Sequence, residues 1–428
     1  MKTSFQYPKY DTYKDSGVPW LGDIPEHWNV TRNLGLFKER KEINQPEMEL
    51  LAVTIKRGVI KQSEITTKKD SSNDDKSKYK VVRRGDLAYN KMRMWQGAIG
   101  ESKYDGIVSP AYIILNTKNK LYSRYFHYLY RTGLFIKEAN RHSYGLCDDM
   151  NSLRYEDFKT IYSPAPPEQD VSRIIDFLDL KTAEIDAAIA KKQELIQLLN
   201  EQKAILLNRA VTKGLNPDVK MKDTGIAWLG EVPEHWEVRR FKYCARVTSG
   251  QVDPRKEPHA SLTLIAPNHI ESSTGKILKL ETAKEQGADS GKYLVEQGDL
   301  IYSKIRPALR KACISPVKAL CSADMYVLKT KSCLRQRFLL WFIMTNAFTT
   351  PAINAAMRVA MPKVNREALG DFPLLIAPLK EQDEILEYID NEFHRIDEIV
   401  NSTKKSLVKL QEFKQTLITH TTTGKIKV

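Results

Sequence analysis

The chain contains two copies of one sequence unit, and this internal repeat limits the folds it can adopt more than any local motif does. Residues 15–32 (DSGVPWLGDIPEHWNVTR) align with residues 223–240 (DTGIAWLGEVPEHWEVRR), and 11 of these 18 positions are identical. Further along, Gly85–Arg93 (GDLAYNKMR) matches Gly298–Arg306 (GDLIYSKIR) in the same order. The repeat predicts two domains of one architecture, in which a shared framework carries divergent segments.

The correspondence continues to the end of each copy. Tyr125–Phe135 matches Phe338–Phe348, and Glu168-Gln169-Asp170 matches Glu381-Gln382-Asp383 at the start of a long helical pattern. Between these matches the copies differ, for example in 56–80 against 268–292. A length of 428 residues suits two globular domains with connecting elements.

Each copy ends in a helical pattern whose apolar residues are spaced alternately by three and four, as in the seam of a coiled coil. The seam residues are Leu178, Ile185, Ile189, Ile196, Leu199, Leu206, Ile389, Phe393, Ile396, Val400, Leu407, Leu410 and Leu417. We expect the two helices to pair with each other; a groove on another partner is the alternative. If the ends of the second domain lie close together, the pair is antiparallel. Helices of about 40 residues span roughly 60 Å, so the pair is a candidate spacer.

These patterns divide the chain into four segments: a first head (1–167), a central helix (168–213), a second head (214–380) and a C-terminal helix (381–428). Each head is expected to be an α/β (α+β) domain of mixed strands with a few helices. The expected fold is therefore two tandem globular copies, joined by a long antiparallel two-helix coiled coil with an internal pseudo-two-fold repeat.

The charge of the chain indicates a polyanionic partner. The net charge is +14, and the two helical segments together carry 14 basic and 17 acidic side chains. The heads therefore carry +17, which favours a nucleic-acid surface on the heads rather than on the helices. A solvated basic face is the alternative.

Composition indicates where the chain works. The first ten residues contain no apolar stretch of a secretion signal, and the longest apolar runs are too short to span a membrane, so we expect a cytoplasmic protein. The five cysteines are scattered without a Cys-x-x-Cys pair, which argues against a disulfide framework or a zinc ribbon and indicates buried thiols.

Reading of duplex DNA requires polar and cationic side chains that reach base edges and phosphates. The first-head candidates for DNA contact are Lys56, Arg57, Tyr89, Lys91, Arg93, Arg141, Ser143 and Tyr144. The second-head candidates are Asn268, His269, Tyr302, Lys304, Arg306, Arg310, Arg358 and Lys363. The repeated Tyr-x-Lys-x-Arg alternation predicts three side chains on one strand face, and its presence in both heads favours phosphate contacts over base discrimination. A solvated polar strand face is the alternative.

Several catalytic motifs do not occur in the sequence. There is no Asn/Asp-Pro-Pro-aromatic segment of an adenine methyltransferase, and Thr423-Gly424-Lys425-Ile426 lacks two features of a Walker motif. Because His27 and His235 occupy equivalent repeat positions, we expect structural roles for them rather than metal ligation. The repeated tryptophans are expected to pack in the core rather than to stack on bases; these are Trp20, Trp28, Trp228 and Trp236.

Taken together, the doubled WLG-x-x-PEHW, GDL-x-Y-x-K-x-R and Glu-Gln-Asp segments resemble the specificity subunit of type I restriction-modification systems over nearly the whole chain. The resemblance implies two target recognition domains, each of which reads one half of a split, asymmetric DNA site, and a subunit that is not itself catalytic. It also implies partners: two modification subunits that use S-adenosylmethionine, and restriction subunits that use ATP and Mg²⁺ for cleavage. No cofactor is expected on this chain.

Two other classes of function remain open from the sequence. One is a stand-alone DNA-binding regulator, and the other is a coiled-coil assembly protein whose basic charge is incidental. Neither requires methyltransferase partners, so co-purification with a methyltransferase distinguishes them from the specificity subunit.

Overall fold

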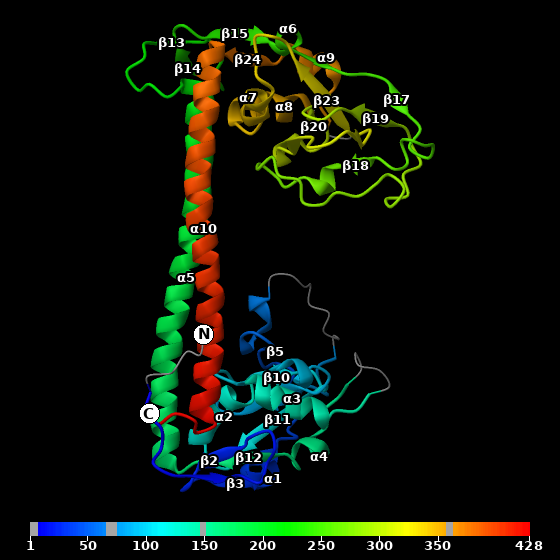
Figure 1. The fold of residues 1–428 in the computed structure, drawn as a ribbon. Helices are drawn as coiled ribbons and strands as arrows, with labels where there is room; N and C mark the ends of the chain where they lie inside the picture. Colours follow the sequence, from blue (N-terminus) through cyan, green and yellow to red (C-terminus); the bar gives the residue numbers. More distant parts are fainter. Residues whose placement is uncertain (1–6, 66–74, 146–150, 357–362) are drawn as a thin grey trace. The chain divides into compact units, whose positions relative to one another are not determined.

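The computed structural model describes residues 7–65, 75–145, 151–356 and 363–428. The chain divides into two compact units, and each combines one head with parts of both long helices. Unit 1 comprises Met1–Lys192 with Lys404–Val428, and unit 2 comprises Gln193–Thr403 (Figure 1). The four segments expected from the sequence give the order of heads and helices along the chain. The two units instead group the residues that pack together, so each long helix is divided between them.

The first head is built around an antiparallel sheet in the order β4-β11-β8-β9. Its strands are β4 (Phe37–Glu39), β11 (Tyr112–Thr117), β8 (Leu87–Asn90) and β9 (Ile99–Glu101). Smaller antiparallel pairs surround this sheet: β1 (Tyr13–Asp15) with β2 (Asp23–Pro25), β3 (Asn29–Arg32) with β12 (Tyr162–Ala165), β5 (Leu51–Thr54) with β6 (Gly58–Lys61), and β7 (Lys80–Val82) with β10 (Gly106–Val108). The helices are α1 (Asn33–Leu36), α2 (Leu121–Leu129), α3 (Gly133–Arg141) and α4 (Tyr155–Phe158).

The second head repeats this sheet as β16-β23-β20-β21 and extends the counterpart of the β7–β10 pair into a second four-stranded sheet, β17-β19-β22-β18. The strands of the repeated sheet are β16 (Ala245–Val247), β23 (Met325–Thr330), β20 (Leu300–Ser303) and β21 (Ala312–Ile314). Those of the second sheet are β17 (Gln251–Val252), β19 (Lys292–Val295), β22 (Ala319–Cys321) and β18 (Thr263–Ile265). The remaining elements are β13 (Met221–Asp223), β14 (Glu231–Pro233), β15 (Glu237–Arg240), β24 (Pro373–Ile376), α6 (Phe241–Cys244), α7 (Gln336–Ile343), α8 (Asn346–Ala356) and α9 (Arg366–Asp371).

The expected mixed α/β heads are therefore confirmed, and the repeat is visible in their sheets. The shared four-stranded sheet is the framework of both heads, while the segments between its strands differ. In the first head these segments form the β5–β6 hairpin and the β7–β10 pair, and in the second head they form a four-stranded sheet whose β19 and β22 correspond to β7 and β10. Sequence divergence thus corresponds to different structures on one framework.

The two long helices are α5 (Glu168–Lys213) and α10 (Leu379–Thr422). In unit 1, Ile185 of α5 and Leu417 of α10 belong to one buried cluster. In unit 2, Leu199 of α5 packs with Ile396 and Val400 of α10. Early residues of one helix thus meet late residues of the other, which confirms the antiparallel coiled coil (Figure 1).

The second helix begins two residues earlier than the sequence comparison predicted. Matching Glu168–Asp170 with Glu381–Asp383 placed its start at Glu381, but α10 begins at Leu379. The strands that precede the two helices end at Ala165 and Ile376, so the structural equivalent of Asp170 is Glu381. Although both segments read Glu-Gln-Asp, their structurally equivalent positions are displaced by two residues.

A glycine with a positive φ angle follows each long helix and packs against the head at the carboxyl end of that helix. Gly214 (φ +72°) follows α5 and lies against Trp236 and Glu381 of unit 2. Gly424 (φ +73°) follows α10, and a Cβ atom there would lie 2.4 Å from Cδ of Pro25 in unit 1. Because a left-handed backbone in close contact requires glycine, both helix ends are fixed to a head.

Cysteine burial follows the sequence expectation in part. Cys244, Cys313 and Cys321 are buried free thiols, and Cys333 is half-buried, while Cys147 lies outside the described residues. Burial raises the pKa of Cys313 and of Cys321 to about 12, so these thiols stay protonated at neutral pH.

Candidate nucleic-acid interface

The PEHW segments hold each head to its long helix through a shared carboxylate. In unit 1, Trp28 Nε1 donates to Asp170 Oδ2 (2.8 Å), and His27 Nε2 lies 2.7 Å from the same oxygen. Burial of Asp170 alone would raise the pKa of this carboxyl, but the hydrogen bonds from Trp28 and His27, with the charges nearby, hold it below its usual value. The arrangement fixes the helix start to the first head.

Unit 2 repeats this arrangement with a glutamate. Trp236 Nε1 donates to Glu381 Oε2 (3.0 Å), and His235 Nε2 lies 2.8 Å from it. The structural roles predicted for His27 and His235 are therefore confirmed. Core packing is confirmed for the buried Trp28 and Trp236 and holds in part for Trp20, whereas Trp228 is 41% exposed.

Two of the candidate cations occupy the tip of the β5–β6 hairpin. Lys56 and Arg57 are exposed there, and the side chain of Arg57 pairs with Glu64. The tip is held from below by Arg131, which donates to the carbonyl oxygens of Ile55 (2.9 Å) and Lys56 (2.5 Å). The side chain of Lys56 has no ion-pair partner among the described residues, so it is available to a ligand.

The Tyr-x-Lys-x-Arg motif does not run along one strand face, and this prediction is wrong. Strands β8 and β20 end at Asn90 and Ser303, so the lysine and the arginine of each copy lie in the turn that follows. Tyr89 (0% exposed) and Tyr302 (1%) face the core instead. Burial raises the pKa of both phenols, and neither side chain can contact DNA in this conformation.

The turns after β8 and β20 present equivalent cations in the two heads. The backbone carbonyl of Lys91 accepts from Leu153 N–H (2.9 Å), and that of Lys304 accepts from Val364 N–H (2.8 Å). Arg93 and Arg306 are exposed, while the two lysines are half-buried. The framework thus fixes the backbone of these turns and leaves their arginine side chains toward solvent.

Two non-glycine residues of the second turn have left-handed backbones. Arg306 and Arg310 both have φ +48° and flank the short 3₁₀ helix Pro307–Leu309. Such conformations cost about 1–3 kcal/mol and occur preferentially at functional positions. Arg310 is half-buried, and its Nη1 donates to the carbonyl of Met344 (2.7 Å). Its role is therefore at least partly to hold α8.

The other second-head candidates are dispersed. Asn268 is exposed, but His269 is 5% exposed and its Nδ1 accepts from Ala266 N–H (3.2 Å). The prediction that His269 contacts DNA is therefore corrected, because its ring belongs to the fold. Lys363 is exposed and its backbone bridges Ile305, whereas Arg358 lies outside the described residues.

The remaining first-head candidates follow α3. Arg141 is exposed at the last position of the helix, and Tyr144 is 67% exposed. Ser143 is half-buried and donates to the carbonyl of Ala139 (2.7 Å), so its hydroxyl is engaged in the fold. Arg141 and Tyr144 stay candidates for DNA contact.

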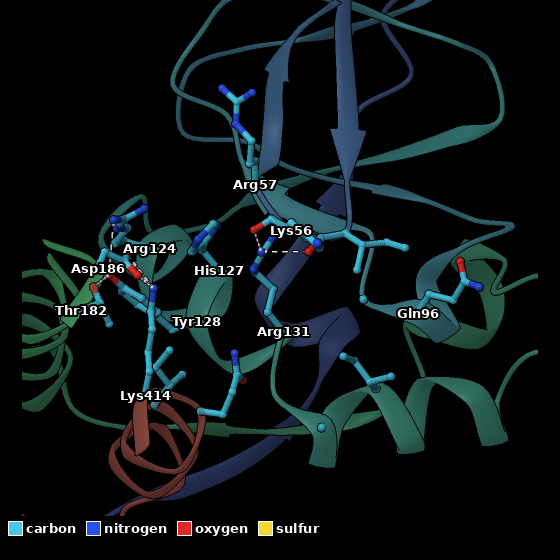
Figure 2. A pocket seen from close by; sticks show the side chains of 16 residues that line it. Lys56, Arg57, Gln96, Arg124, His127, Tyr128, Arg131, Thr182, Asp186 and Lys414 are labelled. Atoms are coloured by element: carbon cyan, nitrogen blue, oxygen red, sulfur yellow. Dashed lines mark hydrogen bonds and ion pairs between the residues drawn. The ribbon is translucent and has the colours of Figure 1, made fainter. Parts of the chain in front are cut away.

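Unit 1 also contains a cationic cleft that the sequence did not reveal. The cleft is about 590 Å³ and lies between the β5–β6 hairpin, α2, α3, α5 and α10 (Figure 2). Five cationic side chains line it with a single carboxylate, Asp186. The five are Lys56, Arg57, Arg124, Arg131 and Lys414. Lys414 comes from a segment far along the chain, which is why spacing alone could not predict the cleft.

No described group resembles a catalytic metal centre. Among the residues that the structure describes, no set of three or more His, Cys, Asp or Glu side chains could hold a metal ion. Within the same residues, no helix is long and apolar enough to cross a membrane.

Comparison with known proteins places this architecture. Type I restriction modification DNA specificity domains match residues 233–410. The specificity subunit of the type I restriction enzyme EcoDI from Escherichia coli is 30% identical over 278 residues, which is 61% of this chain and 61% of that subunit. The putative MjaX specificity subunit from Methanocaldococcus jannaschii is 23% identical over 99% of this chain and 98% of its own length.

Solved structures show the same fold. One solved structure, from work on complex assembly and conformational transition of the type I R-M system, has a TM-score of 0.70. Its sequence is 14% identical over 93% of this chain and 98% of that one. The HsdS subunit from Thermoanaerobacter tengcongensis has a TM-score of 0.53, with 14% identity over 94% and 98%.

The fold has two α/β heads on one framework, and each head packs with parts of the two antiparallel long helices. The sequence matches and this architecture agree. The chain is similar to type I restriction-modification DNA specificity subunits, in sequence over the matched domain at residues 233–410 and in fold over most of its length.

Proposed function

We propose that this chain selects the DNA site of a type I restriction-modification complex, with each head binding one half of a bipartite, asymmetric sequence. The observation that carries the proposal is the repeated turn after β8 and β20. Both copies present a lysine and an exposed arginine, at Lys91 and Arg93 and at Lys304 and Arg306. Equivalent cations on two copies of one framework suit contacts with the repeating phosphates of a duplex.

The segments that differ between the heads are the candidates for base reading. The first head presents the exposed Arg57 on a hairpin tip, while the second presents the exposed Asn268 beside its second sheet. Because different side chains recognise different base edges, two unlike surfaces favour two unlike half-sites. The target is then split and asymmetric.

The helix pair is proposed to set the gap between the half-sites and to dock the modification subunits. Helix α5 has 46 residues, equivalent to about 69 Å of helix. Large apolar side chains remain exposed on its outer surface, with Leu195 41%, Leu198 53% and Ile205 68% exposed. On α10, Ile399 is 48% and Val408 53% exposed. Exposed apolar residues on a paired helix suit packing against helices of a partner.

Catalysis is assigned to the partners. The modification subunits would bind S-adenosylmethionine, and restriction subunits would use ATP and Mg²⁺ for cleavage, while this chain would supply no catalytic group to either reaction. The proposal places the chain in the cytoplasm with its DNA target.

Methylation mapping of the host genome tests the proposal. We expect an adenine-methylated motif in two unequal parts with a fixed gap, and its loss when this gene is deleted. A continuous or palindromic motif, or an unchanged methylome, would contradict it. Co-purification of the intact chain with a methyltransferase separates the proposal from a stand-alone regulator, which requires no such partner.

A further inference from the structure

The cationic cleft of unit 1 contains a charge that the fold does not neutralise. Arg131 donates from Nη1 to the carbonyl of Ile99 (2.9 Å) and from Nη2 to the β5–β6 tip. Among the described residues no carboxylate pairs with it. Burial, and next the charge of Arg124, lower the pKa of the guanidinium, because both disfavour its charged form. A half-buried cation of this kind is stabilised by an anion.

The other cations of the cleft differ in how far they are neutralised. Arg124 pairs with Asp179 (2.8 Å), and Lys414 pairs with Asp186 (2.6 Å). The ammonium of Lys56 has no such partner within the described part of the chain. Lys56 and Arg131 therefore supply positive charge to the cleft that no carboxylate of the fold offsets.

The cleft also offers a neutral donor. The backbone N–H of Glu101 donates to His127 Nδ1 (3.1 Å), so the neutral ring carries its proton on Nε2. Burial and the charges of Arg131 and Arg124 hold the pKa of His127 well below its usual value, which keeps the ring neutral at pH 7. His127 lines the same cleft as Arg131, as Figure 2 shows.

The space itself depends on a glycine. Gly97 lines the cleft with φ +85°, and a Cβ atom there would lie 2.7 Å from Ile136. At the equivalent place in the second head stands Arg310, whose guanidinium donates to Met344. The unit 2 cleft is about 450 Å³ and has Met344 at the place of Arg131. Unit 2 thus lacks a counterpart of Arg131, and its own half-buried guanidinium, that of Arg310, is held by the carbonyl of Met344 and by Asn346 Oδ1.

We propose that the unit 1 cleft is a phosphate-binding site, in which Lys56 and Arg131 contact the anion. Planar guanidinium groups with an ammonium match the oxygens of phosphate, and about 590 Å³ accommodates a ligand of nucleotide size. The phosphate comes either from the DNA backbone or from a free nucleoside polyphosphate. If the phosphate belongs to DNA, the inference rests on the proposed function. If it belongs to a free nucleotide, the inference is independent of that function.

Isothermal titration of inorganic tripolyphosphate into the full-length chain at low ionic strength tests the site. We expect saturable binding that Lys56→Ala weakens by roughly tenfold or more. Arg131→Gln is a second variant that removes the charge but keeps amide donors, with its folding checked by circular dichroism. The matched control is Arg209→Ala, which removes a cation of the unit 2 cleft and should leave the affinity unchanged.

Competition identifies the source of the phosphate. Displacement of tripolyphosphate by a target duplex assigns the cleft to the DNA backbone, and displacement by ATP but not by the duplex assigns it to a free nucleotide; both results support the site. Absence of saturable binding, an unchanged affinity in Lys56→Ala, or a loss confined to Arg209→Ala overturns it. Methylation mapping is independent of this titration, so failure of DNA-site selection and failure of the cleft are distinguishable.

Discussion

Lys203 Nζ of α5 lies 2.8 Å from Asp397 Oδ1 of α10, and the same pair recurs with exchanged helices between Lys414 of α10 and Asp186 of α5 at 2.6 Å. Lysine and aspartate are each displaced by 211 residues between the two pairs. Each unit thus contains the same lysine–aspartate contact between its portions of the two helices, with the helices exchanging roles. The repeat therefore extends to contacts between the helices, although the heads differ.

The Lys203–Asp397 pair should contribute modestly to stability. Its side chains are 16% and 37% exposed, so water partly screens the attraction. We expect Asp397→Asn to lower the free energy of unfolding by about 1 kcal/mol. A double-mutant cycle with Lys203→Met in urea denaturation measures the coupling, and additive effects would show that the pair contributes nothing.

Asp170 should make the stability of the chain depend on acidic pH. Because its folded-state pKa lies below the ordinary value, the carboxylate stabilises the fold above about pH 4, and this contribution is lost as the pH falls through the folded-state pKa. Asp170→Asn should cost about 1–3 kcal/mol at pH 7 and reduce the loss of stability on acidification. Urea denaturation between pH 7 and low pH checks this. Asp176→Asn on an exposed position of the same helix is the control, and an equal effect there would contradict the prediction.

Gly424 should be intolerant of a side chain. A Cβ atom there would lie 2.4 Å from Pro25 and 3.1 Å from Trp28, in addition to the strain of φ +73°. We expect Gly424→Ala to destabilise unit 1 by about 2–4 kcal/mol. Gly17→Ala is the matched control, because Gly17 has φ +68° with no atom within 4 Å. Thermal unfolding compares the two, and equal losses would exclude the contact with Pro25 as the cause.

Tyr89→Phe should leave both DNA affinity and fold intact. The hydroxyls of Tyr89 and of its repeat equivalent Tyr302 are buried without a hydrogen-bond partner among the described residues. Removal of an unpaired buried hydroxyl is neutral or stabilising by up to about 1 kcal/mol. Fluorescence anisotropy with a target duplex provides the check. A weaker affinity with unchanged stability would return Tyr89 to the DNA interface.

Lys91→Ala, by contrast, should lower the affinity for the duplex and reduce the dependence of that affinity on salt concentration.

Shortening both long helices together should change the gap in the DNA site. Deletion of Lys192–Leu198 with its equivalent, Thr403–Lys409, removes one heptad from each helix and retains the seam. The loss is about 10 Å, or about three base pairs. Methylation mapping should show a shorter gap or no methylation, and an unchanged gap with full methylation would reject the spacer.

Sequence periodicity was sufficient for the framework because its signals are local or repeated. The WLG-x-x-PEHW segments located equivalent positions of both heads, and the seam residues predicted helices that pair with each other. The contact residues were harder to predict. Tyr89 has the same local pattern as a strand residue facing water, but β8 is the third strand of a covered sheet, so its ring faces the core.

The sequence by itself determined that the chain has two copies of one framework, a long helix after each, and its positive charge on the heads. Tertiary structure decided which residues meet. Asp170 and Glu381 each lie five residues after the end of the preceding strand, and this spacing brings the carboxylate oxygen to the tryptophan. The match of the two Glu-Gln-Asp segments in sequence does not give this correspondence. Arg131 and Lys414 line one cleft although 283 positions separate them, since an antiparallel helix returns the end of the chain to the first head. Local patterns depend only on neighbouring residues, whereas a site between elements forms only when those elements pack together.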